Sequence, residues 1–176
     1  MTLALLLALS SIISNEKVAV TDGTDTTAHS HDTVVVDLNA KSARYVKQGE
    51  PLAANGRSII IDLLAPPEGP LPNPKNLRAP FDRPGIEKLL DNDRVTVWRY
   101  TWESGKKTPE HFHRNDVVVV YTATGTLASI TADGTPDGKT QMNPHTFGFT
   151  KFSPKGRIHQ EELVKGQASA VMVELK

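Results

Sequence analysis

Short runs of apolar and β-branched residues recur along the chain, and residues that favour turns separate them. The runs of strand length are Thr33–Leu38, Ser58–Leu64, Arg94–Glu103, Val117–Thr122, Thr126–Thr131, Phe147–Phe152 and Ala168–Leu175. Strong turn signals, Asp-Gly pairs at residues 133–134 and 137–138, stand between two of them. Many short strands at regular spacing predict an all-β sandwich or barrel.

The alternation of side chains is strongest in Arg94–Glu103. Trp98, Tyr100 and Trp102 fall on one side of this predicted strand, and Arg99 falls on the other. The aromatic stripe favours a core or a dimer interface, with a stacking surface for a substrate as the alternative. The preceding segment, residues 85–92, has helical spacing instead and predicts two helical turns.

The chain begins with an apolar run. It extends from Leu3 to about Ile13 and is shorter than the roughly 20 residues of a membrane-spanning helix. Its length and the small residues near it predict a signal peptide over residues 1–14, although no positive charge precedes the run. The protein would then be secreted or periplasmic. The alternative is a first strand or helix buried in the fold of a cytoplasmic protein.

A proline-rich segment divides the rest of the chain. Residues 65–84 hold seven of the twelve prolines, and prolines at this density interrupt both helices and sheets. We therefore predict an N-terminal arm over residues 15–84, with two strands and an extended connector, and a barrel over residues 85–176. Within the arm, the polar segment 16–32 is expected to be a tail or linker.

Composition excludes several classes of function. Lys plus Arg equals Asp plus Glu at 20 each, so no net field favours nucleic acid or an anionic membrane as a partner. The chain has no cysteine, which excludes disulfides, thiolate zinc sites, cysteine nucleophiles and iron–sulfur clusters. Any metal is then held by imidazole, carboxylate, amide or water ligands.

Three histidines stand where a barrel can bring them together. His111 and His113 are two residues apart, so they share one face of a strand. A turn at Pro154 and Gly156 delivers His159 at the start of the following strand. We predict that these three imidazoles bind one divalent metal ion. No site is expected at the remaining histidines, which lie in polar or loop segments: His29, His31 and His145.

Two motifs in the second half of the chain resemble those of the cupin superfamily. In the first, a glycine, five residues, His-x-His and a later glycine are matched by Gly105, His111, His113 and Gly125. In the second, a glycine, five residues, Pro-x-Gly, two residues and a histidine are matched by Gly148, Pro154, Gly156 and His159. The resemblance covers roughly residues 92–176. It implies an RmlC-like jelly-roll barrel, a double-stranded β-helix, with a metal at the histidines.

The motifs depart from the family at two positions. The family's glutamate falls on Val118, and its asparagine falls on Leu163. Two carboxylates are candidate substitutes, as fourth ligand or general base. Asp116 lies two residues before Val118 and is expected on the same face of the strand, and Glu161 lies two residues after His159. The alternative for both is a place at the solvated rim.

Arg99 is the candidate anchor for a substrate. On the face opposite the aromatic stripe, it is predicted to enter the barrel and bind a carboxylate bidentately. The alternative is a salt bridge at the rim.

The leading hypothesis is a small metal-dependent oxidoreductase of the dioxygenase type that acts on a small organic molecule. Three-histidine iron sites occur in cupin-like thiol dioxygenases, so the resemblance is compatible with the missing glutamate. The alternatives are a metal-dependent isomerase or lyase and a non-catalytic cupin that binds a small ligand. Iron, copper, nickel, manganese and zinc all suit the site. Small cupins usually pair through N-terminal strands, so the resemblance also implies a homodimer.

Overall fold

The computed structural model describes residues 11–53, 56–73, 75–81, 83–152 and 157–176. Over these residues it has fourteen β-strands and no helix, which confirms the predicted all-β class. The strands form two compact units. One holds the described residues up to Ala40 together with Arg44–Ala65, and the other holds Lys41–Ala43 and Pro66–Lys176. In this described part, no helix is long and apolar enough to cross a membrane.

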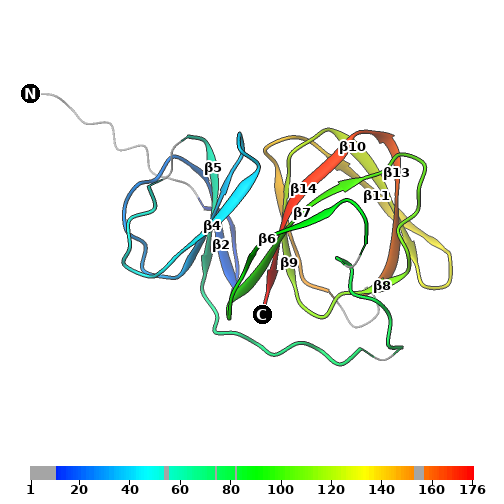
Figure 1. The fold of residues 1–176 in the computed structure, drawn as a ribbon, viewed down its shortest axis with the longest axis horizontal. Helices are drawn as coiled ribbons and strands as arrows, with labels where there is room; N and C mark the ends of the chain where they lie inside the picture. The colour runs from blue at the N-terminus through cyan, green and yellow to red at the C-terminus, as the bar shows by residue number, and fades with distance from the viewer. Residues whose placement is uncertain (1–10, 54–55, 74, 82, 153–156) are drawn as a thin grey trace, which may run out of the picture. The chain divides into compact units, whose positions relative to one another are not determined.

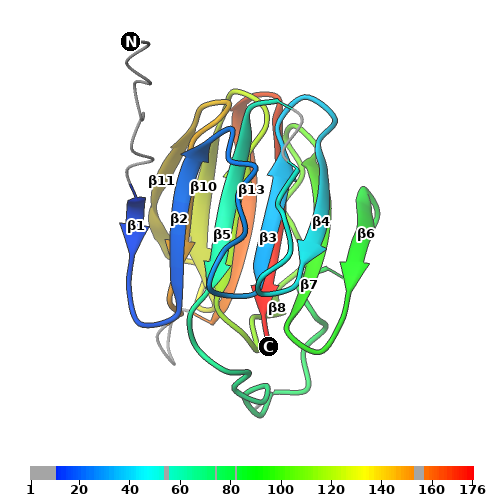
Figure 2. The same ribbon diagram turned by 90° about the vertical axis from the view of Figure 1, so that its left-hand side faces the viewer.

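The first unit is a five-stranded sheet in the order β1-β2-β5-β3-β4 (Figure 2). Its strands are β1 (Ser11–Ser14), β2 (Val18–Gly23), β3 (Thr33–Asp37), β4 (Ser42–Val46) and β5 (Ser58–Leu63), although the first two residues of β4 are grouped with the second unit. The central strand β5 runs antiparallel to both β2 and β3. A continuous β-branched run suits such a position, because a central strand is paired on both edges and buried. Val35, Val46, Leu52 and Ile60 form a core cluster in this unit.

Two strands of this unit, β3 and β5, are those that the apolar runs predicted. The expectation of a tail or linker over residues 16–32 is wrong, because this segment contains β2, which pairs along its whole length with β5. Residues 1–10 of the predicted signal peptide lie outside the described residues. Ser11–Ser14 forms β1 and pairs with β2. The signal peptide stays a prediction.

The second unit consists of two antiparallel sheets, ordered β11-β10-β13-β8 and β12-β9-β14-β7-β6. Its strands are β6 (Ile86–Asp91), β7 (Val95–Trp102), β8 (His111–Phe112), β9 (Val117–Tyr121), β10 (Gly125–Thr131), β11 (Pro136–Met142), β12 (Phe147–Thr150), β13 (Ile158–Gly166) and β14 (Ala168–Leu175). In Figure 1, β7, β9 and β14 form one wall and β11 and β13 form another. One core cluster joins both sheets, with Met142 and Leu163 from one and Trp102 and Met172 from the other. This is the two-sheet arrangement of a cupin-type jelly-roll barrel.

Two segments of the second unit differ from the prediction. The helix expected over residues 85–92 is wrong, because this segment forms β6 and pairs antiparallel with β7. Two isolated helical turns have little stability of their own, and the hydrogen bonds to β7 outweigh the local spacing. A register shift between Lys88 and Leu90 explains why the apolar spacing here is not strictly two. The polar strand β11, exposed except at Met142, was not predicted.

Candidate metal centre

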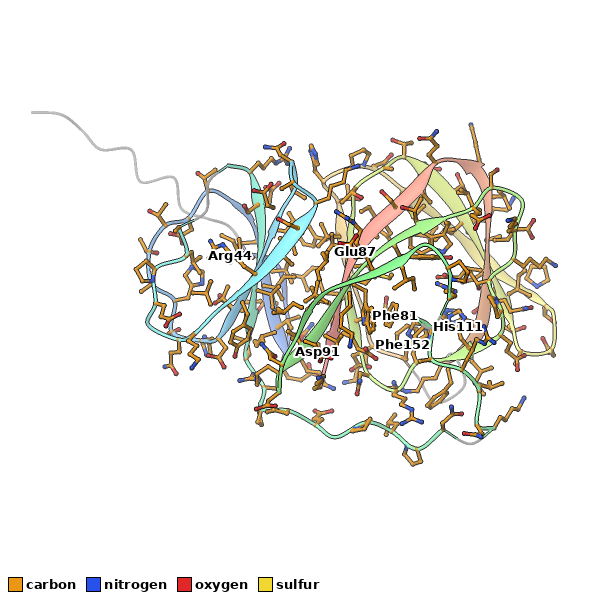
Figure 3. All side chains as sticks on the ribbon, viewed as in Figure 1. Arg44, Phe81, Glu87, Asp91, His111 and Phe152 are labelled. Carbon is orange, nitrogen blue, oxygen red and sulfur yellow. The ribbon has the colours of Figure 1, made fainter. Side chains whose placement is uncertain are left out.

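Strand pairing brings the three predicted histidines together. β8 runs antiparallel to β13, and His111 lies opposite His159. His113 follows β8, and its backbone N–H donates to the Arg157 carbonyl oxygen at 2.9 Å. Each of the three imidazoles offers one ring nitrogen, and these nitrogens all lie within 4.8 Å of one another. Figure 3 shows His111 inside the barrel, close to Phe81 and Phe152.

One hydrogen bond fixes the orientation of the His111 ring. Its Nδ1–H donates to the carbonyl oxygen of Pro109 at 2.8 Å. A carbonyl oxygen only accepts, so Nδ1 carries the proton and Nε2 keeps its lone pair. This Nε2 is buried and has no hydrogen-bond partner among the residues that the structure describes. A buried acceptor without a donor costs stability, and a metal ion would satisfy it.

Two phenylalanine rings hold His113. The Phe152 ring stacks on the imidazole with a centroid distance of 4.1 Å and an interplanar angle of 13°. Phe81 meets the same imidazole edge-on at 6.2 Å. Arg157 Nη1 donates to the His113 carbonyl oxygen at 3.0 Å, which fixes the backbone. These contacts with two aromatic rings and with the backbone restrict the orientation of the imidazole.

The interior of the barrel keeps two of the imidazoles neutral. Burial lowers the pKa of His111 to about 4, and the neighbouring charges of His159 and Arg83 act in the same direction. Burial also holds the pKa of His113 well below its ordinary value of 6.5, as do the other two histidines. Neutral imidazole is the form that binds metals, so no proton has to leave these two rings at neutral pH.

Glu161 lies on β13, two residues after His159, and lines the same cavity. Its Oε2 accepts a hydrogen bond from the Trp102 indole at 2.9 Å, and its Oε1 lies 3.9 Å from His159 Nε2. Burial raises the pKa of Glu161, but its interactions with His159, His111 and Arg83 and the hydrogen bond from the Trp102 indole outweigh this effect and hold the pKa below its ordinary value. The carboxylate is therefore ionised at neutral pH, within reach of a proton on a bound molecule.

Asp116 has a different environment. Its carboxylate accepts hydrogen bonds from Arg157 Nη2 at 3.1 Å and from the Phe152 backbone N–H at 3.2 Å. The residues of β9 that line the cavity are Val117, Val119 and Tyr121. Since side chains alternate along a strand, Val118 faces away from the cavity. Asp116, two residues earlier, lies on the same face as Val118. The structure thus places Asp116 in a buried ion pair behind the site and not at the barrel mouth.

Arg99 does not lie among the residues that line the cavity. Its guanidinium pairs with the carboxylate of Glu87 on β6, and its side chain is 39% exposed. Figure 3 shows Glu87 well apart from His111. The role of Arg99 as a carboxylate anchor stays a prediction that the position of the side chain does not support.

The histidines open into a cavity of about 360 Å³. Its walls combine apolar and polar side chains. The apolar lining residues include Phe81, Trp102, Val117, Leu127, Phe152 and Met172, and the charged ones are Arg83, Asp137, Lys151 and Glu161. A cavity of this size and composition is typical of a small-molecule site. Arg83 was not predicted as a site residue, because it lies at the end of the proline-rich connector, where no periodic pattern indicates which way a side chain points.

No protein-family model matches the chain, and no curated protein matches it. Among solved structures, the chain is similar to a cupin domain from Bordetella pertussis Tohama I, with 28% identity over 54% of this chain and 97% of that chain and a TM-score of 0.43.

Two further solved structures are similar to the chain. A cupin superfamily protein from Desulfitobacterium hafniense DCB-2 has 21% identity over 62% of this chain and 93% of its own, with a TM-score of 0.39. A cupin 2 conserved barrel domain protein from Leptotrichia buccalis has 11% identity over 95% of this chain and 88% of its own, with a TM-score of 0.48. All three are cupin proteins, and the chain's similarity to the cupin superfamily is the one that its two histidine motifs predicted.

Proposed function

We propose that the protein is a small metal-dependent oxidoreductase of the dioxygenase type, with its metal held by His111, His113 and His159. The observation that carries the proposal is the set of three ring nitrogens within 4.8 Å of one another. The orphaned, buried Nε2 of His111 indicates a ligand that accepts its lone pair. Three imidazole donors suit iron, copper, nickel, manganese or zinc.

When bound, a divalent first-row ion supplies a Lewis acid with open coordination positions, and iron or copper also supplies one-electron chemistry. The protein's own groups would do the rest. Neutral imidazoles leave the charge of the ion undiminished, which favours an anionic or polarisable substrate. Glu161 would accept a proton at Oε1 and later return it, while the Trp102 indole holds its other oxygen. Phe81 and Phe152 would keep water away from the histidines.

A non-redox isomerase or lyase is the second candidate, and the position of Glu161 favours it. An ionised carboxylate beside a Lewis acid can take a proton from the carbon next to a polarised carbonyl group. This reaction needs the same three histidines and the same base. The two candidates therefore differ in the metal that the site selects and in the need for oxygen.

Oxygen uptake distinguishes the two. We expect the protein loaded with iron(II) or copper(II) to consume oxygen with members of a panel of small organic acids, thiols and diols. His111→Ala is expected to abolish the uptake, and His31→Ala, outside the cavity, is the matched control. Retention of zinc alone, with no oxygen uptake on the panel, would overturn the oxidoreductase and favour the isomerase or lyase.

A further inference from the structure

The charged group of Arg83 is buried in the wall of the cavity. Its side chain is only 6% exposed. Its Nε and Nη1 atoms have no hydrogen-bond acceptor among the described residues. The guanidinium carbon lies 4.2 Å above the Tyr100 ring, and Nη2 is 3.7 Å from Glu161 Oε2, beyond hydrogen-bond distance. Buried N–H donors of a cation that stay unpaired are costly, so their persistence indicates a ligand.

The fold holds Arg83 in this position. The connector enters β6 at Gly85, whose carbonyl oxygen accepts from the Thr101 backbone N–H at 3.3 Å. Gly85 has a φ of 82°, and a Cβ atom there would come within 3.1 Å of the Thr101 carbonyl oxygen. Glycine therefore permits the close approach that places Arg83 over the aromatic face of β7. On the other side, Phe81 stacks on Trp98 at 5.1 Å and fixes the connector against the barrel.

The charges around the cavity cancel only while no metal is bound. Arg83 and Lys151 contribute one positive charge each and Glu161 and Asp137 one negative charge each, while the three histidines are neutral ligands for a divalent ion. With the proposed metal bound, the cavity carries two positive charges in excess. In a cavity partly lined by apolar side chains such an excess favours an anionic molecule.

The lining also limits the kind of anion. Two cationic side chains line the cavity, Arg83 and Lys151, and only Arg83 has buried N–H groups without an acceptor among the described residues; apolar rings such as Phe81 and Trp102 line the same cavity. A carboxylate needs few donors, whereas a phosphate carries more charge and usually needs several. A cavity of about 360 Å³ holds a molecule with a carboxylate at one end and a small apolar body.

We propose that Arg83 selects the substrate of this site, a small organic carboxylate whose charged end binds the free N–H groups of Arg83 and whose apolar body packs against Phe81, Trp102 and Phe152. This inference rests on the proposed function, because it takes the cavity beside the metal as the substrate site. It also moves the carboxylate anchor from Arg99, which the sequence suggested, to a residue of the connector.

Calorimetric titration of the full-length protein tests this inference, with zinc bound and after its removal. The probes are phenylacetate, benzoate and hexanoate, with phenylacetamide as the uncharged analogue and inorganic phosphate as the competing anion. We expect phenylacetate to bind at least tenfold more tightly than phenylacetamide, because charge-assisted hydrogen bonds are the stronger ones. Arg83→Gln is expected to weaken phenylacetate binding by about tenfold to a hundredfold while binding of the amide stays the same.

Arg57→Gln is the matched control, since Arg57 pairs with Asp22 in the first unit. Arg83→Lys, which keeps the charge, is expected to recover part of the affinity. The comparison of acid and amide on the wild type needs no variant, so it holds even if Arg83→Gln folds poorly. Equal binding of acid and amide, stronger binding of phosphate, or no binding of the three carboxylates at about 10 mM would overturn the inference.

The metal content of each protein separates the two proposals. If the wild type holds no metal, the metal site is wrong, and carboxylate binding to the metal-free protein still tests Arg83. If the wild type and Arg83→Gln hold equal metal but neither distinguishes acid from amide, the role of Arg83 is wrong and the metal site stands.

Discussion

His159 lies opposite His111 in the antiparallel pairing of β13 with β8, and their imidazole centroids are 4.6 Å apart. Neighbours across two strands lie at such distances because the pairing sets them, and no loop has to position the rings. The site therefore depends on register: a slip of one residue would turn one of the two rings to the opposite face. His113, the residue after β8, supplies the third imidazole of the proposed metal site.

Glu161→Gln separates metal binding from proton transfer. The amide keeps the shape of the side chain and can still accept the hydrogen bond from Trp102, but it cannot take a proton. We expect wild-type metal content and a turnover that falls by about a hundredfold or more, measured by steady-state kinetics on the metal-loaded protein. Glu162→Gln, on the same strand, is the control. A variant with full turnover would show that Glu161 is not the base.

Asp116→Ala should affect stability and not chemistry. The ion pair with Arg157 has side chains only 3% and 9% exposed, and removal of one partner leaves the other charge buried. We expect the free energy of unfolding to fall by about 3–5 kcal/mol in urea denaturation, with wild-type metal content in the protein that remains folded. Asp93→Ala, at an exposed position, is expected to stay within about 0.5 kcal/mol of the wild type. Equal stability of the two variants would contradict this account.

Arg99→Gln is expected to change little. Arg99 and Glu87 form an exposed pair, and such pairs contribute about 1 kcal/mol or less. The variant should bind phenylacetate as the wild type does in the same calorimetric titration. A loss of affinity as large as that of Arg83→Gln would return Arg99 to the substrate site.

The sequence predicted the parts of the site that depend on local spacing. His111, His113 and His159 follow from the alternation along a strand and from one turn. The sequence did not show which side chains of β9 face the cavity. Val117 to Val120 form a uniformly apolar run, and without alternation nothing indicates on which face Asp116 lies. Arg83 was missed because its position depends on how a connector without period lies against β7.

His29 illustrates the same limit in the first unit, where the sequence indicated no role. Its Nδ1 lies 2.6 Å from Asp62 Oδ1, and its Nε2 lies 3.0 Å from Asp25 Oδ2. Burial lowers the pKa of His29, but the hydrogen bonds and charges of the two carboxylates outweigh it and raise the pKa above the ordinary value of 6.5. The partners Asp62 and His29 are 33 residues apart, so no local pattern connects them.

This arrangement predicts a pH dependence of stability. Because the pKa of folded His29 is raised, its contribution is fully present below about pH 6.5 and is lost as the pH rises through the higher value of the folded protein. We expect His29→Gln to lower the free energy of unfolding by about 1 kcal/mol at pH 6 and by less at pH 9, followed by circular dichroism in urea. His31→Gln is the control. A difference that is constant or grows with pH would contradict the charged form of His29.

The metal content of the full-length protein, purified without chelator and measured by elemental mass spectrometry, tests the central claim most directly. We predict about one first-row transition ion per chain in the wild type, loss of that ion in His159→Ala, and retention in His31→Ala. Removal of the ion by a chelator should also lower the unfolding temperature of the wild type and leave that of His159→Ala unchanged. Wild-type protein without metal above background, or an equal metal content in His159→Ala, would contradict the account.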